Sequence, residues 1–320
     1  MLNTADLLRL EYSPDLTEAG IAYACQHLGR ISNRDISLQY ADWRQSVIDK
    51  AVELALRRYL SQKDIVFTTI ATTGAGRLDP YHLTVGGWHC FLQAFWIDSP
   101  QVAQSVLVQP ECLLQAGAVL PADRIIAWVP GEKDAYIFAY VARAVADAAP
   151  DRHAAASHWG LLLPSDWSNP HPWATLGRLE LMYRGHEDLL ITMGGEGDTL
   201  APVSEQVLLM PGQRVMSQSA YASLGTLHTS QLPTGTLDIH RSFQPGSYQV
   251  LPSTWKSLAY SGQTIFLGGF ISHADFARRS RRMEAGCQVF PGIQARGKAR
   301  LLWVRELRPL RELFEPPSPG

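Results

Sequence analysis

The segment of residues 42–96 constrains the fold most, because its hydrophobic period changes halfway along. Its first half contains apolar residues at the i, i+3 or i+4 spacing of an amphipathic helix, namely Trp43, Val47, Ala51, Leu54 or Ala55, and Tyr59. Its second half contains β-branched and aromatic runs at residues 65–70, 81–85 and 89–97. Gly86 and Gly87 separate the last two runs, as in a tight hairpin. The pattern predicts a helix followed by a meander.

Particular residues within this segment carry a family resemblance. Glu53 lies inside the helix, the corner before the hairpin reads Asp-Pro-Tyr-His-Leu from Asp79, and the strand after the hairpin contains Cys-Phe-Leu-Gln-Ala-Phe from Cys90. Together with the Gly-Gly turn, this arrangement resembles the core of the PD-(D/E)XK nucleases, which have the restriction-endonuclease-like fold. The resemblance covers residues 42–143 and extends to the C-terminal quarter, where a strand followed by a basic helix is typical of the end of such a sheet. It implies an α/β or α+β fold with a mixed central sheet flanked by helices.

The resemblance also implies where a nuclease centre would lie. In that superfamily a helix Glu, a corner Asp and an acid-x-Lys pair meet around a divalent cation, and Mg²⁺ polarises the phosphate and acidifies the attacking water. Here Glu53 takes the place of the helix acid and His82 that of the corner Asp. Phe91 and Gln93 take the places of the acid and the Lys. An imidazole, a phenyl ring and a neutral amide thus replace two acids and an ammonium, so we expect an inactive centre without a cofactor.

Other residues keep an active centre open as an alternative. Asp79 is a substitute corner acid if the register shifts by three residues, and Mg²⁺ is expected if the chain is an active nuclease. Glu18 is a rival helix acid, but a whole helix separates it from the meander. His82 and His89 lie on the two strands of the predicted hairpin, which leaves a histidine-assisted site open.

The distribution of charge gives a second functional prediction. The formal net charge is −2, which gives no overall field for nucleic acid or membranes. Residues 271–320 hold ten Lys or Arg against five acids, so this part carries +5 and the remainder −7. We predict a helix at residues 274–283 that presents Arg278, Arg281 and Arg282 on one face to phosphates. The full predicted nucleic-acid-binding set is Arg278, Arg279, Arg281, Arg282, Arg296, Lys298 and Arg300. The alternative is a solvated helix end whose cations suit the helix dipole.

Changes of pattern along the chain predict three ranges. Residues 1–150 form the nuclease-like α/β core, and residues 151–262, rich in turn residues and short strand-like runs, form a β-rich insertion or second subdomain. Residues 263–320 return to the core with an Arg-rich C-terminal region. Elements predicted outside the opening segment are helices at 2–10, 16–28 and 142–149 and strands at 124–129, 135–141, 264–271 and 299–304.

The remaining sequence signals bear on location and on other kinds of site. The four cysteines are scattered and form no C-x-x-C pair, which is typical of reduced thiols in a cytoplasmic protein. No apolar run approaches the length of a membrane span, so we expect no membrane partner. The Gly-rich stretches match neither a phosphate-binding loop nor a dinucleotide fingerprint.

These observations lead to one functional hypothesis and two alternatives. We predict a catalytically inactive nuclease-like protein that binds nucleic acid or is a subunit of a DNA-processing or defence assembly. The first alternative is an active metal-dependent endonuclease with an atypical site made of Glu53, Asp79 or His82, and Gln93. The second is a protein-interaction module that binds no nucleic acid, which the near-neutral net charge favours.

Overall fold

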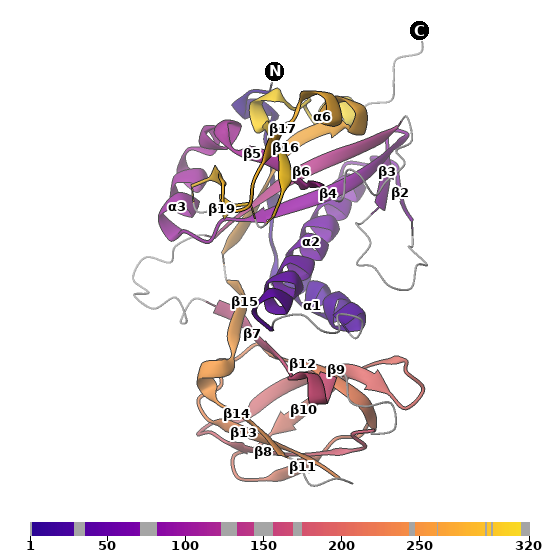
Figure 1. Cartoon of the computed structure of the whole chain (residues 1–320), viewed down its shortest axis with the longest axis vertical. Helices are drawn as coiled ribbons and strands as arrows, with labels where there is room; N and C mark the ends of the chain where they lie inside the picture. Colours follow the sequence, from indigo (N-terminus) through magenta and orange to yellow (C-terminus); the bar gives the residue numbers. More distant parts are fainter. Residues whose placement is uncertain are drawn as a thin grey trace. The chain divides into compact units, whose positions relative to one another are not determined.

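The computed structural model describes residues 2–28, 36–70, 82–122, 133–143, 156–168, 175–242, 247–260, 262–291, 293–295 and 297–314 (Figure 1). Residue contacts divide the chain into two compact units. The first unit comprises Met1–Leu16, Ile48–Asp147 and Gly262–Gly320, and the second comprises Thr17–Val47 and Ala148–Ser261. Residues 17–47, which lie in the first predicted range, therefore group with the β-rich segment instead.

A six-stranded mixed sheet forms the centre of the first unit, in the order β1-β16-β6-β4-β3-β2. Strands β2 (Phe67–Ile70), β3 (His82–Val85) and β4 (Trp88–Trp96) form the antiparallel meander. Strand β4 runs parallel to β6 (Asp134–Arg143), whereas β16 (Gln263–Ser272) is antiparallel to both β6 and β1 (Leu8–Glu11). The expectation of a mixed sheet in an α+β protein is confirmed. The helix predicted at residues 2–10 is wrong, because this segment forms a short 3-10 turn, η1 (Thr4–Asp6), and then pairs as β1 with β16.

The helix and hairpin predicted in the opening segment are confirmed. Helix α2 (Ile36–Gln62) precedes the meander, and Gly86 and Gly87 have φ values of 57° and 75°, as a tight turn between β3 and β4 requires. In the described residues, β3 pairs with β4 from Val85 opposite Trp88 to His82 opposite Phe91. Further along β4, Asp49 of α2 accepts a hydrogen bond from the backbone N–H of Ala94 at 3.3 Å, which places α2 against β4.

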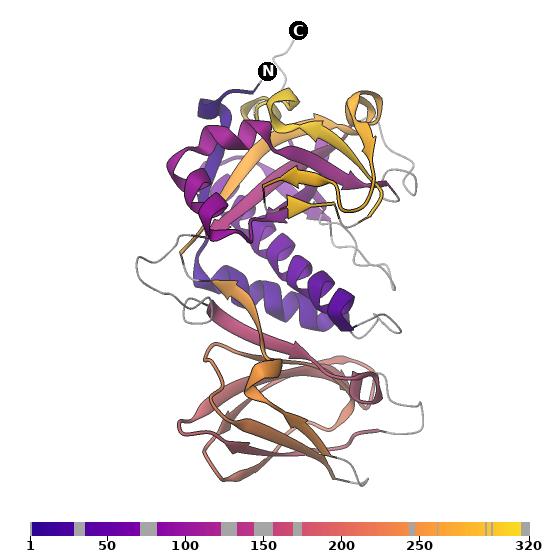
Figure 2. The ribbon, with the colours of Figure 1, turned by 60° about the vertical axis from the view of Figure 1, so that its left-hand side comes forward.

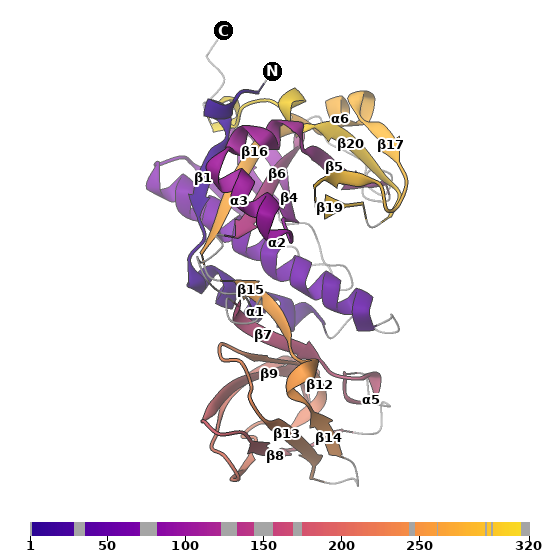
Figure 3. The ribbon, with the colours of Figure 1, turned by 90° about the vertical axis from the view of Figure 1, so that its left-hand side faces the viewer.

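One face of this sheet packs into a large apolar cluster. The cluster includes Phe91 of β4, Phe138 of β6 and Phe266 of β16, and strands β6 and β16 are buried at every position. Around it lie α3 (Pro100–Val108), η2 (Pro110–Gln115), α6 (His273–Arg279) and the small sheet β17-β20-β5, made of Arg281–Met283, Ala299–Trp303 and Gly117–Pro121. Figure 3 shows β5, β20 and β17 next to α6. The hairpin β18 (Gln288–Phe290) and β19 (Ile293–Gln294) adds further apolar side chains, and η4 (Val304–Glu306) and α7 (Arg311–Phe314) follow β20.

Two antiparallel sheets packed face to face form most of the second unit (Figure 2). The five-stranded sheet has the order β10-β9-β12-β7-β15, and the four-stranded sheet has the order β11-β8-β13-β14. Their shared core includes Trp159 and Ile191 from the first sheet and Leu181 and Ile239 from the second. The strands are β7 (Ala156–Leu162), β8 (Leu179–Arg184), β9 (Leu189–Gly197), β10 (Pro202–Leu209), β11 (Arg214–Met216), β12 (Tyr221–Thr229), β13 (Thr236–Arg241), β14 (Ser247–Val250) and β15 (Lys256–Tyr260).

Helical segments accompany these two sheets. Helix α1 (Pro14–Leu28) contributes Ile21 and Ala24 to a small cluster with Trp43 and Val47 of α2 and Leu258 of β15. The short segments α5 (Ser165–Ser168) and η3 (Pro252–Thr254) connect strands. The strand predicted at 124–129 lies outside the described residues, as does the predicted helix 142–149 beyond Arg143, where residues 142 and 143 belong to β6. None of the helices in the described ranges has both the length and the apolar composition that a membrane crossing requires.

Candidate nucleic-acid interface

The Arg-rich segment folds as a short helix followed by a strand, and the prediction of one helix over residues 274–283 is wrong. Helix α6 begins after Ser272, whose hydroxyl accepts a hydrogen bond from the Asp275 N–H, and it ends at Arg279. Ser280 is buried, and its hydroxyl donates to the carbonyl of Phe276. Arg281 and Arg282 then pair as β17 with β20. Because a strand and a helix end present side chains differently, Arg278, Arg281 and Arg282 do not form one helical stripe.

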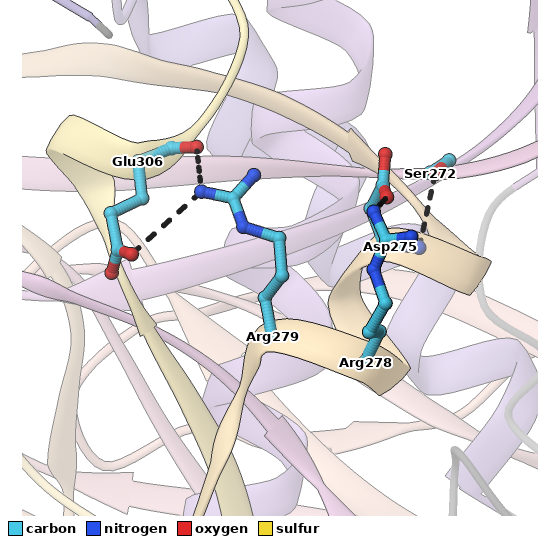
Figure 4. Close-up of polar contacts among 5 residues, drawn as sticks. All are labelled: Ser272, Asp275, Arg278, Arg279 and Glu306. Carbon is cyan, nitrogen blue, oxygen red and sulfur yellow. Dashed lines mark hydrogen bonds and ion pairs between the residues drawn. The ribbon is translucent and has the colours of Figure 1, made fainter.

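Acidic neighbours neutralise the two arginines at the end of α6 (Figure 4). Arg278 forms an ion pair with Asp275 one turn earlier, with 2.5 Å between Nη2 and Oδ1. The Nη2 of Arg279 lies 3.7 Å from the Glu306 carboxylate and donates to the Glu306 carbonyl at 3.2 Å. Both arginines are therefore engaged within the protein, although the Arg278 side chain is 76% exposed.

Arg300 has a structural role at the C-terminus of α6. Its Nη2 donates to the carbonyl of Ala277 at 2.6 Å and to that of Ser280 at 2.7 Å. Carbonyl groups at a helix C-terminus lack partners within the helix, and a cation there also suits the helix dipole. Arg300 is thus turned towards the protein, and the prediction that it extends an open phosphate-binding patch is not supported by its contacts.

Three cations of the predicted set are exposed at the β17–β20 pair. The guanidinium carbon of Arg281 lies 4.9 Å from the ring centroid of Trp303, at the far end of β20. Arg282 lies opposite Arg300 in the register, and Lys298 precedes the first residue of β20. Arg282 and Lys298 are exposed and form no ion pair with any residue in the described ranges. We call Arg281, Arg282 and Lys298 the cationic surface; Arg296 lies outside the described residues.

The helix acid of the expected nuclease centre is held by its own helix. Glu53 is 5% exposed, and its carboxylate lies 2.6 Å from the Lys50 ammonium and 3.3 Å from the Arg57 guanidinium. Both partners lie on α2, at the i−3 and i+4 positions. These two cations occupy the carboxylate oxygens that a metal ion would need.

The other expected positions of that centre offer no metal ligand set. The Phe91 ring packs against that of Tyr136 of β6 at a tilt of 48° inside the apolar cluster. Gln93 follows on the same face of β4, where its amide donates to the carbonyl of Ala94 at 3.3 Å. No side chain of α2 among the described residues belongs to that cluster, so Phe91 and Glu53 lie in different environments. His82 begins β3 opposite Phe91, but its side chain and all of Asp79 lie outside the part described. Among the described residues, no group of three or more His, Cys, Asp or Glu could hold a metal ion. The described side chains do not fit Mg²⁺.

A polar cluster at one end of the central sheet was missed by sequence reasoning, except for His89. His89 is 53% exposed, and its Nδ1 lies 3.4 Å from a carboxylate oxygen of Asp134, which is 4% exposed. Nearby, the Tyr136 hydroxyl and Nδ1 of His273 are 2.7 Å apart. Burial lowers the pKa of His273, and the Asp134 carboxylate partly offsets this effect. The sequence signal was a polar residue at the end of each apolar strand, but only strand pairing brings these residues together.

Comparison of the chain with protein-family models, with curated proteins and with solved structures finds no match in any of the three.

Proposed function

We propose that this protein is a nuclease-like scaffold without cleavage activity that binds nucleic acid through the cationic surface, alone or as a subunit of a DNA-processing or defence assembly. The observation that carries the proposal is that Arg281, Arg282 and Lys298 are exposed at the β17–β20 pair and form no ion pair within the described ranges. Free cations are the groups that bind phosphates and release counterions, whereas ion-paired cations must first lose their partners.

The arrangement of charge supports this choice of surface. Residues 271–320 carry +5 in a chain of net charge −2, and two of the five acids in that sum, Asp275 and Glu306, are paired with Arg278 and Arg279. The cations left unpaired in the described part of this region include all three members of the cationic surface. A local field of this kind attracts a polyanion even when the whole chain is almost neutral.

The scaffold part of the proposal rests on the opening segment. An interior helix acid, a meander with a Gly-Gly turn and the strand that follows it are the elements on which the resemblance to PD-(D/E)XK nucleases depends, and the mixed sheet is consistent with what it implies. Against cleavage stand the ion pairs of Glu53 and the apolar contacts of Phe91. A carboxylate that two cations already neutralise is a poor ligand for a hard divalent ion.

The binding test compares two triple variants by fluorescence anisotropy with labelled oligonucleotides at about 50 mM salt. Replacing Arg281, Arg282 and Lys298 by Ala should abolish most binding and lower the slope of log affinity against log salt by about one per cation lost. The matched control replaces Arg178, Arg184 and Arg214, three exposed arginines of the second unit, by Ala. The control changes net charge equally and should bind nearly as the parent does. Equal losses in both variants, or no binding by the parent, contradict the proposed interface.

The cleavage test incubates the protein with supercoiled plasmid and Mg²⁺ or Mn²⁺. We expect no nicking above the level of the Glu53→Ala variant. Metal-dependent nicking that disappears in Glu53→Ala, while the variant keeps the circular dichroism spectrum of the folded parent, would favour the active endonuclease instead. An absence of both binding and nicking favours a protein-interaction module.

A further inference from the structure

Strand β10 is an open edge of the five-stranded sheet in the second unit. All eight of its residues pair with β9 without a bulge, and no segment of the described residues pairs with it on its other side. The backbone N–H and C=O groups along such an edge can hydrogen-bond to one further strand. At the opposite edge of the sheet, β15 has five residues and an irregular register with β7. β10 is therefore the longer and more regular of the two edges.

The exposed side chains of β10 lack charge. Proteins commonly protect an exposed edge with charged side chains, with proline inside the strand or with bulges. Along β10 the exposed positions are Pro202, Ser204, Gln206 and Leu208, and they are followed by Met210. Pro202 is the first residue of the strand, a position where proline leaves the pairing of the later residues intact. Two copies of this edge can therefore approach each other without electrostatic repulsion.

The single acid of β10 lies on the opposite face and is bound within its own chain. Glu205 is 9% exposed, and its carboxylate accepts hydrogen bonds from the backbone N–H groups of Gln218 at 2.6 Å and Ser219 at 2.9 Å. On the same face, Val207 and Leu209 are buried in the core that the two sheets share. The inward face of β10 thus belongs to the sandwich, and only its edge and its outward face are open.

The order of residues along β10 suits an identical strand in antiparallel orientation. Directly opposite residues of an antiparallel pair lie on the same face, so pairing about a two-fold axis places one residue opposite its own copy. With Glu205 on the axis, two carboxylates would lie opposite each other, which is unfavourable. With Gln206 on the axis, Glu205 lies opposite Val207 of the other copy. Two neutral amides then meet, and each can both donate and accept a hydrogen bond.

Exposed apolar surface beside the edge gives a second reason for association. Leu208 is 52% exposed and lies directly opposite Leu190 of β9, which is 40% exposed. In the register centred on Gln206, Leu208 lies opposite Ser204 of the other copy, so the added strand covers part of this leucine pair. Removing apolar surface from water favours the paired state.

We propose that two copies of this chain associate through β10, antiparallel about a two-fold axis at Gln206, so that their five-stranded sheets form one continuous sheet. This interface lies in the second unit, and the inference is independent of nucleic-acid binding.

Sedimentation equilibrium at several protein concentrations measures the association. The parent should form a dimer that dissociates on dilution. Gln206→Lys places two ammonium groups opposite each other and should raise the dissociation constant about fivefold or more. The matched control is Gln249→Lys on β14, an edge strand of the other sheet, where Gln249 is exposed and its amide donates to Asp238 at 3.1 Å. This control adds the same charge and should change the dissociation constant less than about twofold.

Cysteine cross-linking tests the register by a separate measurement. Directly opposite residues of an antiparallel pair have Cβ atoms about 4.5–5.5 Å apart, so two cysteines there can form a disulfide after a small adjustment. Gln206→Cys should give a disulfide-linked dimer under mild oxidation. Gln249→Cys and the parent, which both keep the exposed Cys287, should give much less.

A parent that stays monomeric at every concentration overturns the inference. Equal dissociation constants for Gln206→Lys and Gln249→Lys, or equal cross-linking of the two cysteine variants, also overturn it. A circular dichroism spectrum of Gln206→Lys that matches that of the parent shows that weaker association does not come from unfolding. If Gln206→Lys does not fold, the yields of the cross-linked dimers decide.

Discussion

Arg282 and Arg300 are direct cross-strand neighbours on β17 and β20, and their guanidinium groups have opposite environments. Arg300 donates to two backbone carbonyls at the end of α6, at 2.6 and 2.7 Å. Arg282 is exposed and forms no ion pair within the described ranges. Arg300 thus stabilises the C-terminal end of α6, and Arg282 is available to a ligand.

Arg300→Ala should therefore destabilise the protein, whereas Arg282→Ala should not. Loss of the two charge-assisted hydrogen bonds leaves the α6 carbonyls without these donors and should cost about 1.5–3 kcal/mol in the free energy of unfolding. Arg282→Ala should change that free energy by no more than about 0.5 kcal/mol. Urea unfolding of both variants measures the difference. Equal values would show that the Arg300 contacts contribute nothing.

Glu53→Gln should also destabilise the fold, because it leaves Lys50 largely buried without its counter-charge. The Glu53 side chain is 6% exposed and that of Lys50 is 17% exposed, so solvent replaces the lost ion pair poorly. We expect a loss of about 1–3 kcal/mol. The control is Glu312→Gln, which breaks another i,i+4 pair with Arg308 whose side chains are 45% and 42% exposed, and should cost no more than about 0.5 kcal/mol. Denaturant midpoints of the two variants show whether the Glu53 ion pairs stabilise the fold or contribute as little as the exposed pair of Glu312.

Gly86→Ala should be more damaging than the same change at Gly286. Both residues have positive φ, 57° and 80°, so alanine strains the backbone at either position by about 1 kcal/mol. At Gly86 a methyl group would also lie 2.0 Å from the carbonyl oxygen of Leu313, whereas at Gly286 no atom lies within 4 Å. The expected result is a clearly lower thermal midpoint for Gly86→Ala, measured by circular dichroism. Similar midpoints would mean that the C-terminal segment moves away without cost.

The second unit should lose stability in acid because of a buried histidine and a partly buried one that contact each other. His158 of β7 and His228 of β12 stack with 3.1 Å between Nδ1 and Nε2, and burial lowers the pKa of both, that of His228 to about 3. The charge of His158 further lowers the pKa of His228, while Glu18 of α1 raises the pKa of His158 in part. The unfolded chain therefore binds more protons than the folded chain below about pH 6.5, and stability falls as the pH is lowered from there.

For His228 this loss is about 1.4 kcal/mol per pH unit, and it continues down to the folded pKa of about 3. Hydrogen exchange of the β7 and β12 amides at about pH 7.5 and pH 5 measures it. His228→Gln should make the pH dependence shallower by about one proton, whereas the control His186→Gln, in an exposed loop, should leave it unchanged. A steep dependence that persists in His228→Gln would assign the effect to other groups.

Local sequence signals predicted the elements whose burial shows in their own pattern. The amphipathic spacing around Val47 and Ala51 predicted α2, and Gly86-Gly87 predicted the turn of the meander. The near-continuous apolar runs predicted β6 and β16, because a strand covered on both faces has no polar side. Glu53 was recognised as an interior helix acid, but its pattern did not show that Lys50 and Arg57 hold it.

The chain by itself thus determined which segments hide apolar surface and where the cations gather, since both follow from residue type and spacing. Only the tertiary structure decided that residues 8–11 and 281–283 are strands, because each acquires its hydrogen bonds from a partner far away in sequence, β16 and β20. For the same reason, only the tertiary structure separated the arginines that contact acids or carbonyl groups of the protein from those that are exposed without such partners. A guanidinium binds whichever carboxylate, carbonyl or ring lies within reach, and reach is set by the packing of distant segments.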